Sequence, residues 1–185
     1  MFYGFLYVPA QAEDYNNLLQ KLAPSTMQVQ YAGNLGLASL GIGKTFAKGK
    51  IVSYIIYGYL PKQINGVEVQ TLALKTTRQL KKIDWHGNFT TYTGLDLICG
   101  FTHNSYIYFP KYFPKSYYDF PIALHAAPLI GESFSWRTKE GKKIHYGAFL
   151  EISTLDYYLI DYFKNIRSMD FTNLWSLSFG LNYLF

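Results

Sequence analysis

The sequence has little cysteine and little charge, and each shortage excludes a class of protein. Cys99 is the single cysteine among 185 residues, so no intramolecular disulfide forms and no CxxC pair exists for zinc binding or thiol redox chemistry. Charged residues make up 16% of the chain and apolar residues 49%, a balance that argues against disorder. We expect one folded domain that carries no metal ion and no other cofactor.

Long hydrophobic runs are also missing from the sequence. The best run, residues 51–60, is interrupted by Ser53 and ends before Pro61 and Lys62. A helix needs about 18 or more consecutive apolar residues to cross a bilayer. The sequence therefore excludes transmembrane helices.

The N-terminal segment has features of a secretory signal but lacks its basic start. Residues 1–12 form a short apolar stretch that ends in Ala-Gln-Ala, the A-x-A pattern typical of a cleavage site. No Lys or Arg precedes Lys21, although a complete signal begins with basic residues. We interpret residues 1–12 as the remnant of a signal peptide, with a first apolar strand as the alternative, and residues 13–26 as a periplasmic lead-in.

Aromatic residues, by contrast, are abundant: the chain contains 18 Tyr, 14 Phe and 3 Trp. Rings with one apolar and one wet end are enriched where proteins cross a membrane interface. We interpret the Tyr-rich stretch 106–118 as an interfacial girdle or loop, with carbohydrate stacking or docking of a protein partner as alternatives. The net charge of +5 is spread over turns, which favours contacts with lipid phosphates and argues against nucleic-acid binding.

Apolar residues alternate with small or polar ones along most of the chain from Met27 onward, which is the period of half-buried strands. The segment 155–163 fits neither a helix nor a strand well. The sequence predicts an all-β fold, a closed antiparallel up-and-down transmembrane β-barrel of about eight strands over residues 27–185. The expected strands cover residues 27–46, 50–60, 67–79, 89–101, 120–136, 143–153 and 175–185.

The face opposite the apolar residues decides between a soluble and a membrane barrel. Exposed faces of soluble sheets prefer Lys and Glu, whereas the lumen of an eight-stranded barrel has room only for packed side chains. Most Lys and Arg residues fall at expected turns and strand ends, and the strand middles are nearly free of charge. The residues opposite the apolar ones are repeatedly small, namely Gly41, Gly43, Ala73, Gly94, Ala123, Gly147 and Gly180. This pattern favours a barrel whose apolar face points outward into lipid.

The C-terminal run WSLSFGLNYLF carries hydrophobic residues at alternate positions and ends on Phe185. It resembles the C-terminal strand by which bacterial outer-membrane barrels are presented to their insertion machinery. The runs NLGLASLGIGKTF, YGYLPKQINGVEVQTLALK and FLEISTLDYYLIDYFKN are similar to a group of small, functionally uncharacterised barrel proteins of Gram-negative bacteria. The resemblance implies a location in the bacterial outer membrane, among lipids that include lipopolysaccharide, and implies no activity.

Strand parity predicts a group of polar side chains inside the barrel. Carboxylates, imidazoles and an ammonium group in one lumen are suited to catalysis or proton relay. We favour a network that neutralises buried charge and holds strand register, because a filled small barrel offers a substrate no entry. The members of this expected lumen network are Lys75, Asp96, His125, His145 and Glu151, with Asn182 on the same face.

Two residues are weak catalytic candidates. His103 and Ser105 invite comparison with the His and Ser of outer-membrane lipid A deacylases, but those enzymes carry a His-x-Ser-Asn order, whereas here Asn104 precedes the serine. The His-Asp-Ser set of a palmitoyltransferase barrel is not supplied by the isolated Asp-Trp-His at 84–86. We therefore favour a loop and assign no catalytic residue.

These observations lead to one expected function and two alternatives. We expect an integral outer-membrane barrel, monomeric as a fold, with a structural or accessory role or as a subunit of a larger outer-membrane protein complex. The first alternative is an outer-leaflet lipid-modifying enzyme that uses His103 and Ser105. The second alternative is a soluble lipocalin-like carrier.

Overall fold

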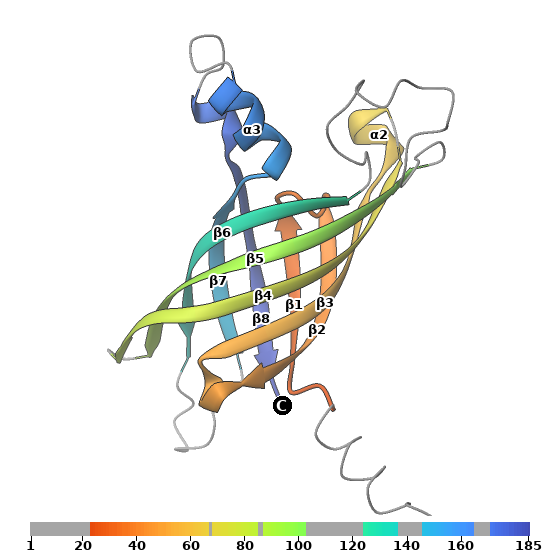
Figure 1. Cartoon of the computed structure of the whole chain (residues 1–185). Helices are drawn as coiled ribbons and strands as arrows, with labels where there is room; N and C mark the ends of the chain where they lie inside the picture. Colours follow the sequence, from red (N-terminus) through yellow and green to blue (C-terminus); the bar gives the residue numbers. More distant parts are fainter. Residues whose placement is uncertain (1–22, 67, 85–86, 103–123, 137–145, 165–170) are drawn as a thin grey trace, which may run out of the picture.

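The computed structural model describes residues 23–66, 68–84, 87–102, 124–136, 146–164 and 171–185, which form a closed barrel of eight strands (Figure 1). Each strand pairs antiparallel with the next one in sequence. The strands are Thr26–Ala32 (β1), Ala38–Phe46 (β2), Ile51–Leu60 (β3), Val69–Asp84 (β4), Asn88–Thr102 (β5), Leu124–Ser135 (β6), Tyr146–Ser153 (β7) and Ser176–Leu184 (β8). The prediction of an all-β, closed, up-and-down barrel is confirmed.

β8 closes the barrel by pairing with β1. The register runs from Thr26 opposite Leu184 to Ala32 opposite Ser178, while β7 lies on the other side of β8. Because this ladder is continuous, neither β1 nor β8 presents an open row of backbone N–H and C=O groups along it.

The expectation of one strand over residues 27–46 is wrong. The chain turns between β1 and β2, and Gly33 and Gly36 adopt φ values of +84° and +117° there. Ala32 also has a positive φ of 60°. The alternation of small and apolar residues continues through this turn, so periodicity alone did not reveal it. The partner of β8 is therefore β1, and β2 pairs with β1 and β3.

The two ends of the barrel carry different connections (Figure 1). At the end where the C-terminus lies, here named the terminus end, the 3-10 turn η1 (Ala47–Gly49) joins β2 to β3. The opposite end, named the loop end, carries the helices α2 (Lys62–Asn65) and α3 (Asp156–Lys164) and the 3-10 turn η2 (Phe171–Leu174). α3 accounts for the ambiguous pattern of the segment 155–163, because most of that segment is helical.

Two inward glycines make room for large side chains in the lumen. A Cβ atom on Gly43 would lie 2.4 Å from the ring of Tyr54, and one on Gly131 would lie 2.6 Å from the ring of Tyr92. Real Cβ atoms do not approach other atoms so closely. The small residues of the inward face therefore allow tyrosine rings to fill the narrow interior.

Candidate functional site

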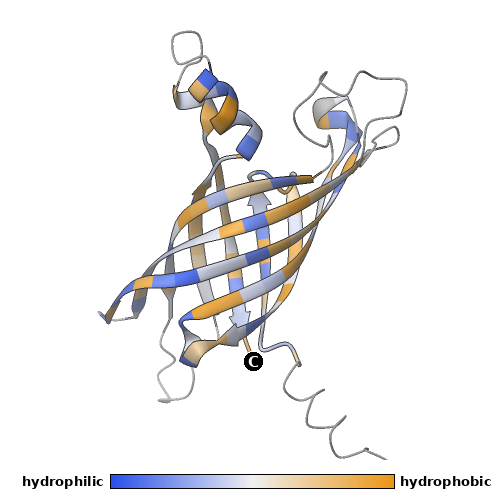
Figure 2. Cartoon of the chain, in the orientation of Figure 1, coloured by the Kyte–Doolittle hydropathy of each residue, from blue (hydrophilic) through white to orange (hydrophobic). Residues whose placement is uncertain are grey.

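The outward face of the barrel carries exposed apolar side chains on every strand. Figure 2 colours the apolar residues of the strands orange. On β8, for example, Leu177, Phe179 and Leu181 are 56%, 53% and 60% exposed. Contiguous apolar surface of this extent is rare on soluble monomers. We name this surface the outward apolar belt; it consists of Val29, Leu40, Ile42, Ile55, Tyr57, Leu72, Leu74, Leu95, Leu97, Leu124, Ile130, Leu150, Ile152, Leu177, Phe179 and Leu181.

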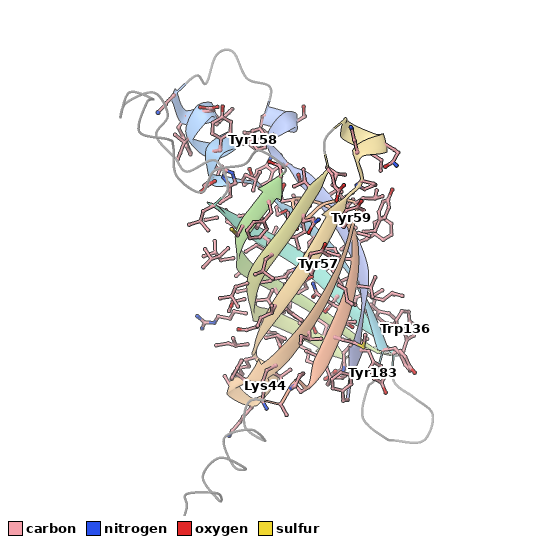
Figure 3. The ribbon with its side chains drawn as sticks, turned by 90° about the vertical axis from the view of Figure 1, so that its right-hand side faces the viewer. Lys44, Tyr57, Tyr59, Trp136, Tyr158 and Tyr183 are labelled. Atoms are coloured by element: carbon pink, nitrogen blue, oxygen red, sulfur yellow. The ribbon has the colours of Figure 1, made fainter. Side chains whose placement is uncertain are left out.

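Aromatic side chains lie toward both ends of this belt. Tyr57 and Tyr59 lie toward the loop end, and Trp136 and Tyr183 lie at the terminus end (Figure 3). At the terminus end the rings contact one another, with 5.0 Å between the ring centroids of Tyr146 and Tyr183. This arrangement matches the aromatic girdles that flank the lipid-facing band of membrane barrels.

An ion pair lies in the middle of the lumen. Lys75 of β4 and Glu151 of β7 are 1% and 4% exposed, and their Nζ and Oε2 atoms are 2.5 Å apart. The Lys75 ammonium also donates to Gln30 Oε1 at 3.1 Å and lies 5.2 Å from the centroid of the Phe149 ring. The hydroxyl of Tyr92 donates to Glu151 Oε1 at 2.9 Å. Each charge thus has several polar or aromatic partners, as burial of an ion pair requires.

Four buried side-chain atoms have no hydrogen-bond partner among the described residues, namely Gln28 Nε2, Ser39 Oγ, Asn88 Oδ1 and Asp96 Oδ1. Asp96, opposite Lys75 in the β4–β5 register, is 3% exposed, and its Oδ1 atom accepts no hydrogen bond there. The Nε2 atom of Gln28 likewise has no acceptor. Buried polar atoms of this kind are normally satisfied by water. The lumen therefore contains hydrogen-bond donors and acceptors that can bind water in addition to their protein neighbours.

The expected lumen network is only partly brought together. Lys75, Asp96 and Glu151 lie in the lumen, whereas His125 lies near the loop end, where its Nδ1 atom is 3.1 Å from Oδ1 of Asp156 in α3. His145 lies outside the described residues, as do His103 and Ser105.

Asn182, on the same predicted face, lines a cavity at the terminus end. This cavity has a volume of about 220 Å³ and reaches the polar groups around the ion pair. Its wall includes Gln28, Tyr92 and Lys75. Since hydroxyl, amide and ionic groups line it, water and small polar molecules are the species that it can hold. The charged centre of the lumen is thus approached from the terminus end.

The loop-end half of the lumen holds an apolar cluster that sequence reasoning missed. Leu35, in the turn between β1 and β2, is 1% exposed and packs with Ile56, Ala73, Ile98 and Ala127 from the barrel wall. We name these five residues the apolar plug. The alternation of residues assigned Leu35 to a strand, although the closely spaced turn formers Gly33, Asn34 and Gly36 are a sequence signal that could have indicated a turn.

The turn that carries Leu35 is tied to the barrel wall by polar contacts. The carbonyl of Leu35 accepts a hydrogen bond of 2.7 Å from the hydroxyl of Thr71, and the Asn34 amide donates to Ser153 at 3.0 Å. Gly58 allows this approach, because a Cβ atom there would lie 2.0 Å from the Leu35 carbonyl oxygen. The turn therefore lies inside the mouth of the barrel, with the Leu35 carbonyl and the Asn34 amide both bonded to the wall.

Among the described residues, no helix has the length and apolar content that a membrane crossing demands. The same residues contain no group of three or more His, Cys, Asp or Glu side chains that would suit a metal ion. Comparisons with models of known protein families, with curated proteins and with solved structures give no match.

Proposed function

We propose that this protein is an integral outer-membrane β-barrel with a structural or accessory role. The observation that carries the proposal is the outward apolar belt, which surrounds the barrel while the lumen holds a paired lysine and glutamate. Burying one exposed leucine or phenylalanine side chain contributes about 1.5–3 kcal/mol. A hydrocarbon layer around the belt would remove all of these side chains from water at once.

The polarity of the barrel argues against the soluble carrier. A lipocalin-like protein needs an apolar interior for its ligand and a polar exterior for water. Here Lys75 and Glu151 lie inside, and Leu181 and Phe179 lie outside. This is the polarity expected of a barrel that has lipid outside and polar groups inside.

The lengths of the connections favour one orientation in the membrane. η1 is a short turn at the terminus end, whereas α2, α3 and η2 lie in the connections of the loop end. Outer-membrane barrels have short periplasmic turns and longer extracellular loops. We therefore place the terminus end in the periplasm, where Lys48 and Lys50 are exposed near the lipid phosphates.

The filled lumen favours a structural or accessory role over conduction. The apolar plug occupies the loop-end half, so among the described residues the cavity at the terminus end does not continue to the other end as a wide polar path. The lipid-modifying alternative depends on His103 and Ser105, and no observation on the described residues favours it.

Refolding into lipid vesicles tests the membrane assignment. We expect the purified full chain to float with vesicles in a density gradient, to resist carbonate extraction and to migrate faster on an SDS gel before heating than after. Sedimentation without the vesicles, together with equal migration before and after heating, would refute the assignment. Co-purification from native membranes in mild detergent then tests for a partner complex.

A further inference from the structure

Polar and charged side chains interrupt the outward apolar belt on one side of the barrel. These side chains point outward like the belt residues, because alternate residues of a strand face the same side. Leu74, Leu95 and Ile130 of the belt each lie two positions from one of them. We name this group the outward polar patch; it consists of Thr76 and Arg78 on β4, Thr91 and Thr93 on β5, and Glu132 on β6.

The outward polar patch lies within the belt rather than beyond it. β6 runs toward the terminus end, and Phe134 and Trp136 follow Glu132 along it, with their rings 5.4 Å apart. The aromatic residues at the terminus end therefore lie farther from the centre of the barrel than Glu132 does. In the proposed membrane orientation this glutamate lies on the hydrocarbon side of the girdle, where an exposed charge is unfavourable.

The two charges of the outward polar patch are poorly satisfied within one chain. Glu132 Oε1 accepts a hydrogen bond of 2.7 Å from the Thr91 hydroxyl. The exposed guanidinium of Arg78 has neither a hydrogen bond nor an ion pair with the described residues. A partner that brings opposite charges to both groups would remove their exposure to lipid.

The strand register gives the outward polar patch a two-fold complementary layout. Arg78 is opposite Thr93 in the β4–β5 register, and Glu132 is opposite Thr91 in the β5–β6 register. The arginine and the glutamate therefore lie on opposite sides of β5, with two short threonine side chains between them. A two-fold axis in front of β5, parallel to the barrel axis, brings the arginine of each copy toward the glutamate of the other.

We propose that the outward polar patch is the contact surface of a symmetric dimer, in which a second copy of this chain is the occupant. The proposal rests on the proposed function, because exposure of the patch is costly only in lipid. The two threonines at the centre allow close approach of the barrels, as small residues do between membrane helices. Two reciprocal arginine–carboxylate pairs then replace contacts between these charges and hydrocarbon.

Charge reversal in lipid vesicles tests the proposed pairing. Arg78→Glu alone and Glu132→Arg alone each place like charges face to face, so we expect each to weaken dimerisation about tenfold or more, which corresponds to about 1.4 kcal/mol. The double variant restores opposite charges and should return to within about threefold of the wild type. Energy transfer between donor- and acceptor-labelled chains, at increasing dilution in lipid, measures the association. Lys44→Glu is the matched control, because it makes the same charge change on β2, outside the patch.

Cross-linking tests the position of the two-fold axis. In a Cys99→Ser background, Thr93→Cys should form a disulfide-linked dimer on mild oxidation, because residue 93 of both copies lies at the centre of the contact. Val29→Cys, on the outward face of β1, should remain monomeric.

The outcomes separate the dimer from the membrane proposal. A chain that floats with vesicles but is monomeric at every dilution overturns the dimer alone. The same holds if the single charge reversals associate like the wild type, or if the double variant is as weak as the single ones. A chain that fails to float overturns both proposals.

Discussion

The loop-end and terminus-end halves of the lumen are built from different side chains. In the loop-end half, Leu35 packs against small and aliphatic residues of the wall such as Ile56 and Ala73. In the terminus-end half, amide and hydroxyl groups surround a cavity of about 220 Å³. The two halves meet at the ion pair of Lys75 and Glu151. The comparison shows that one end is sealed by packing, while the other gives water access to a buried charge pair.

The turn that carries Leu35 contacts the barrel wall through its backbone as well as through its side chains. A turn folded into a barrel mouth would normally leave buried carbonyl groups without partners. Here Thr71 donates to the Leu35 carbonyl, and Gly58 leaves the space for this contact. The turn therefore closes the loop end without leaving this carbonyl unpaired. Buried polar atoms without a partner among the described residues remain in both halves, for example Ser39 Oγ near the loop end and Gln28 Nε2 near the terminus end.

Removing one charge where the two halves meet should have the largest effect on stability. We expect Glu151→Leu to lower the free energy of unfolding by about 3–5 kcal/mol, because it removes the carboxylate that forms the ion pair with the buried Lys75 ammonium. Urea unfolding from lipid vesicles, followed by tryptophan fluorescence, measures the change. The matched double variant, Lys75→Met with Glu151→Leu, removes both charges and should recover most of the loss. A double variant as unstable as the single one would contradict this account.

The outer surface offers a contrast to both halves of the lumen. Phe179 is 53% exposed on the outward face of β8, and its ring lies 5.1 Å from that of Tyr31. We expect Phe179→Arg to cost about 2–4 kcal/mol if the site is at the bilayer midplane, because the guanidinium then faces hydrocarbon. Phe179→Leu is the control and should cost clearly less. Equal stabilities of the two variants in vesicle unfolding would argue decisively against a lipid-facing Phe179.

The apolar plug should be more sensitive to truncation than the wall of the cavity. We expect Leu35→Ala to cost about 2 kcal/mol, at the low end for a buried leucine, because the turn can partly relax into the space. Asn182→Ala, in the wall of the open cavity, should change stability by about 0.5 kcal/mol or less. Unfolding of both variants under the same conditions measures the difference. If both lose the same stability, the two halves are not packed differently.

The accessibility of introduced cysteines to a thiol reagent should distinguish the two halves of the lumen, and this comparison does not depend on a change in stability. In a Cys99→Ser background, Asn182→Cys should react with a small, water-soluble maleimide, because the cavity is open at the terminus end. Ala73→Cys lies in the apolar plug, where the native side chain is 3% exposed, and should react only after unfolding. Mass spectrometry of the labelled, vesicle-embedded protein measures both. Fast labelling of the second variant in the folded state would show that the loop end is not sealed.

Local alternation in the sequence was enough to assign most strands and their two faces. It placed Lys75, Asp96 and Glu151 on the inward side, because neighbouring side chains of a strand point to opposite faces. It did not separate β1 from β2, because the residues of the turn continue the same alternation. It also left α3 undecided, because its apolar residues follow neither period well.

The sequence by itself determined the barrel fold and which face of each strand is apolar. Both depend only on the period of the residues along each strand. The tertiary structure alone decided which inward groups meet. Asp96 is the neighbour of Lys75 across one ladder, yet the ammonium pairs with Glu151 three strands farther along the sheet. Closure of the sheet brings β4 and β7 face to face across a narrow lumen, and no local pattern contains that distance. The same curvature brings Leu35 against β3 and β4, which turns a loop residue into the seal of the barrel.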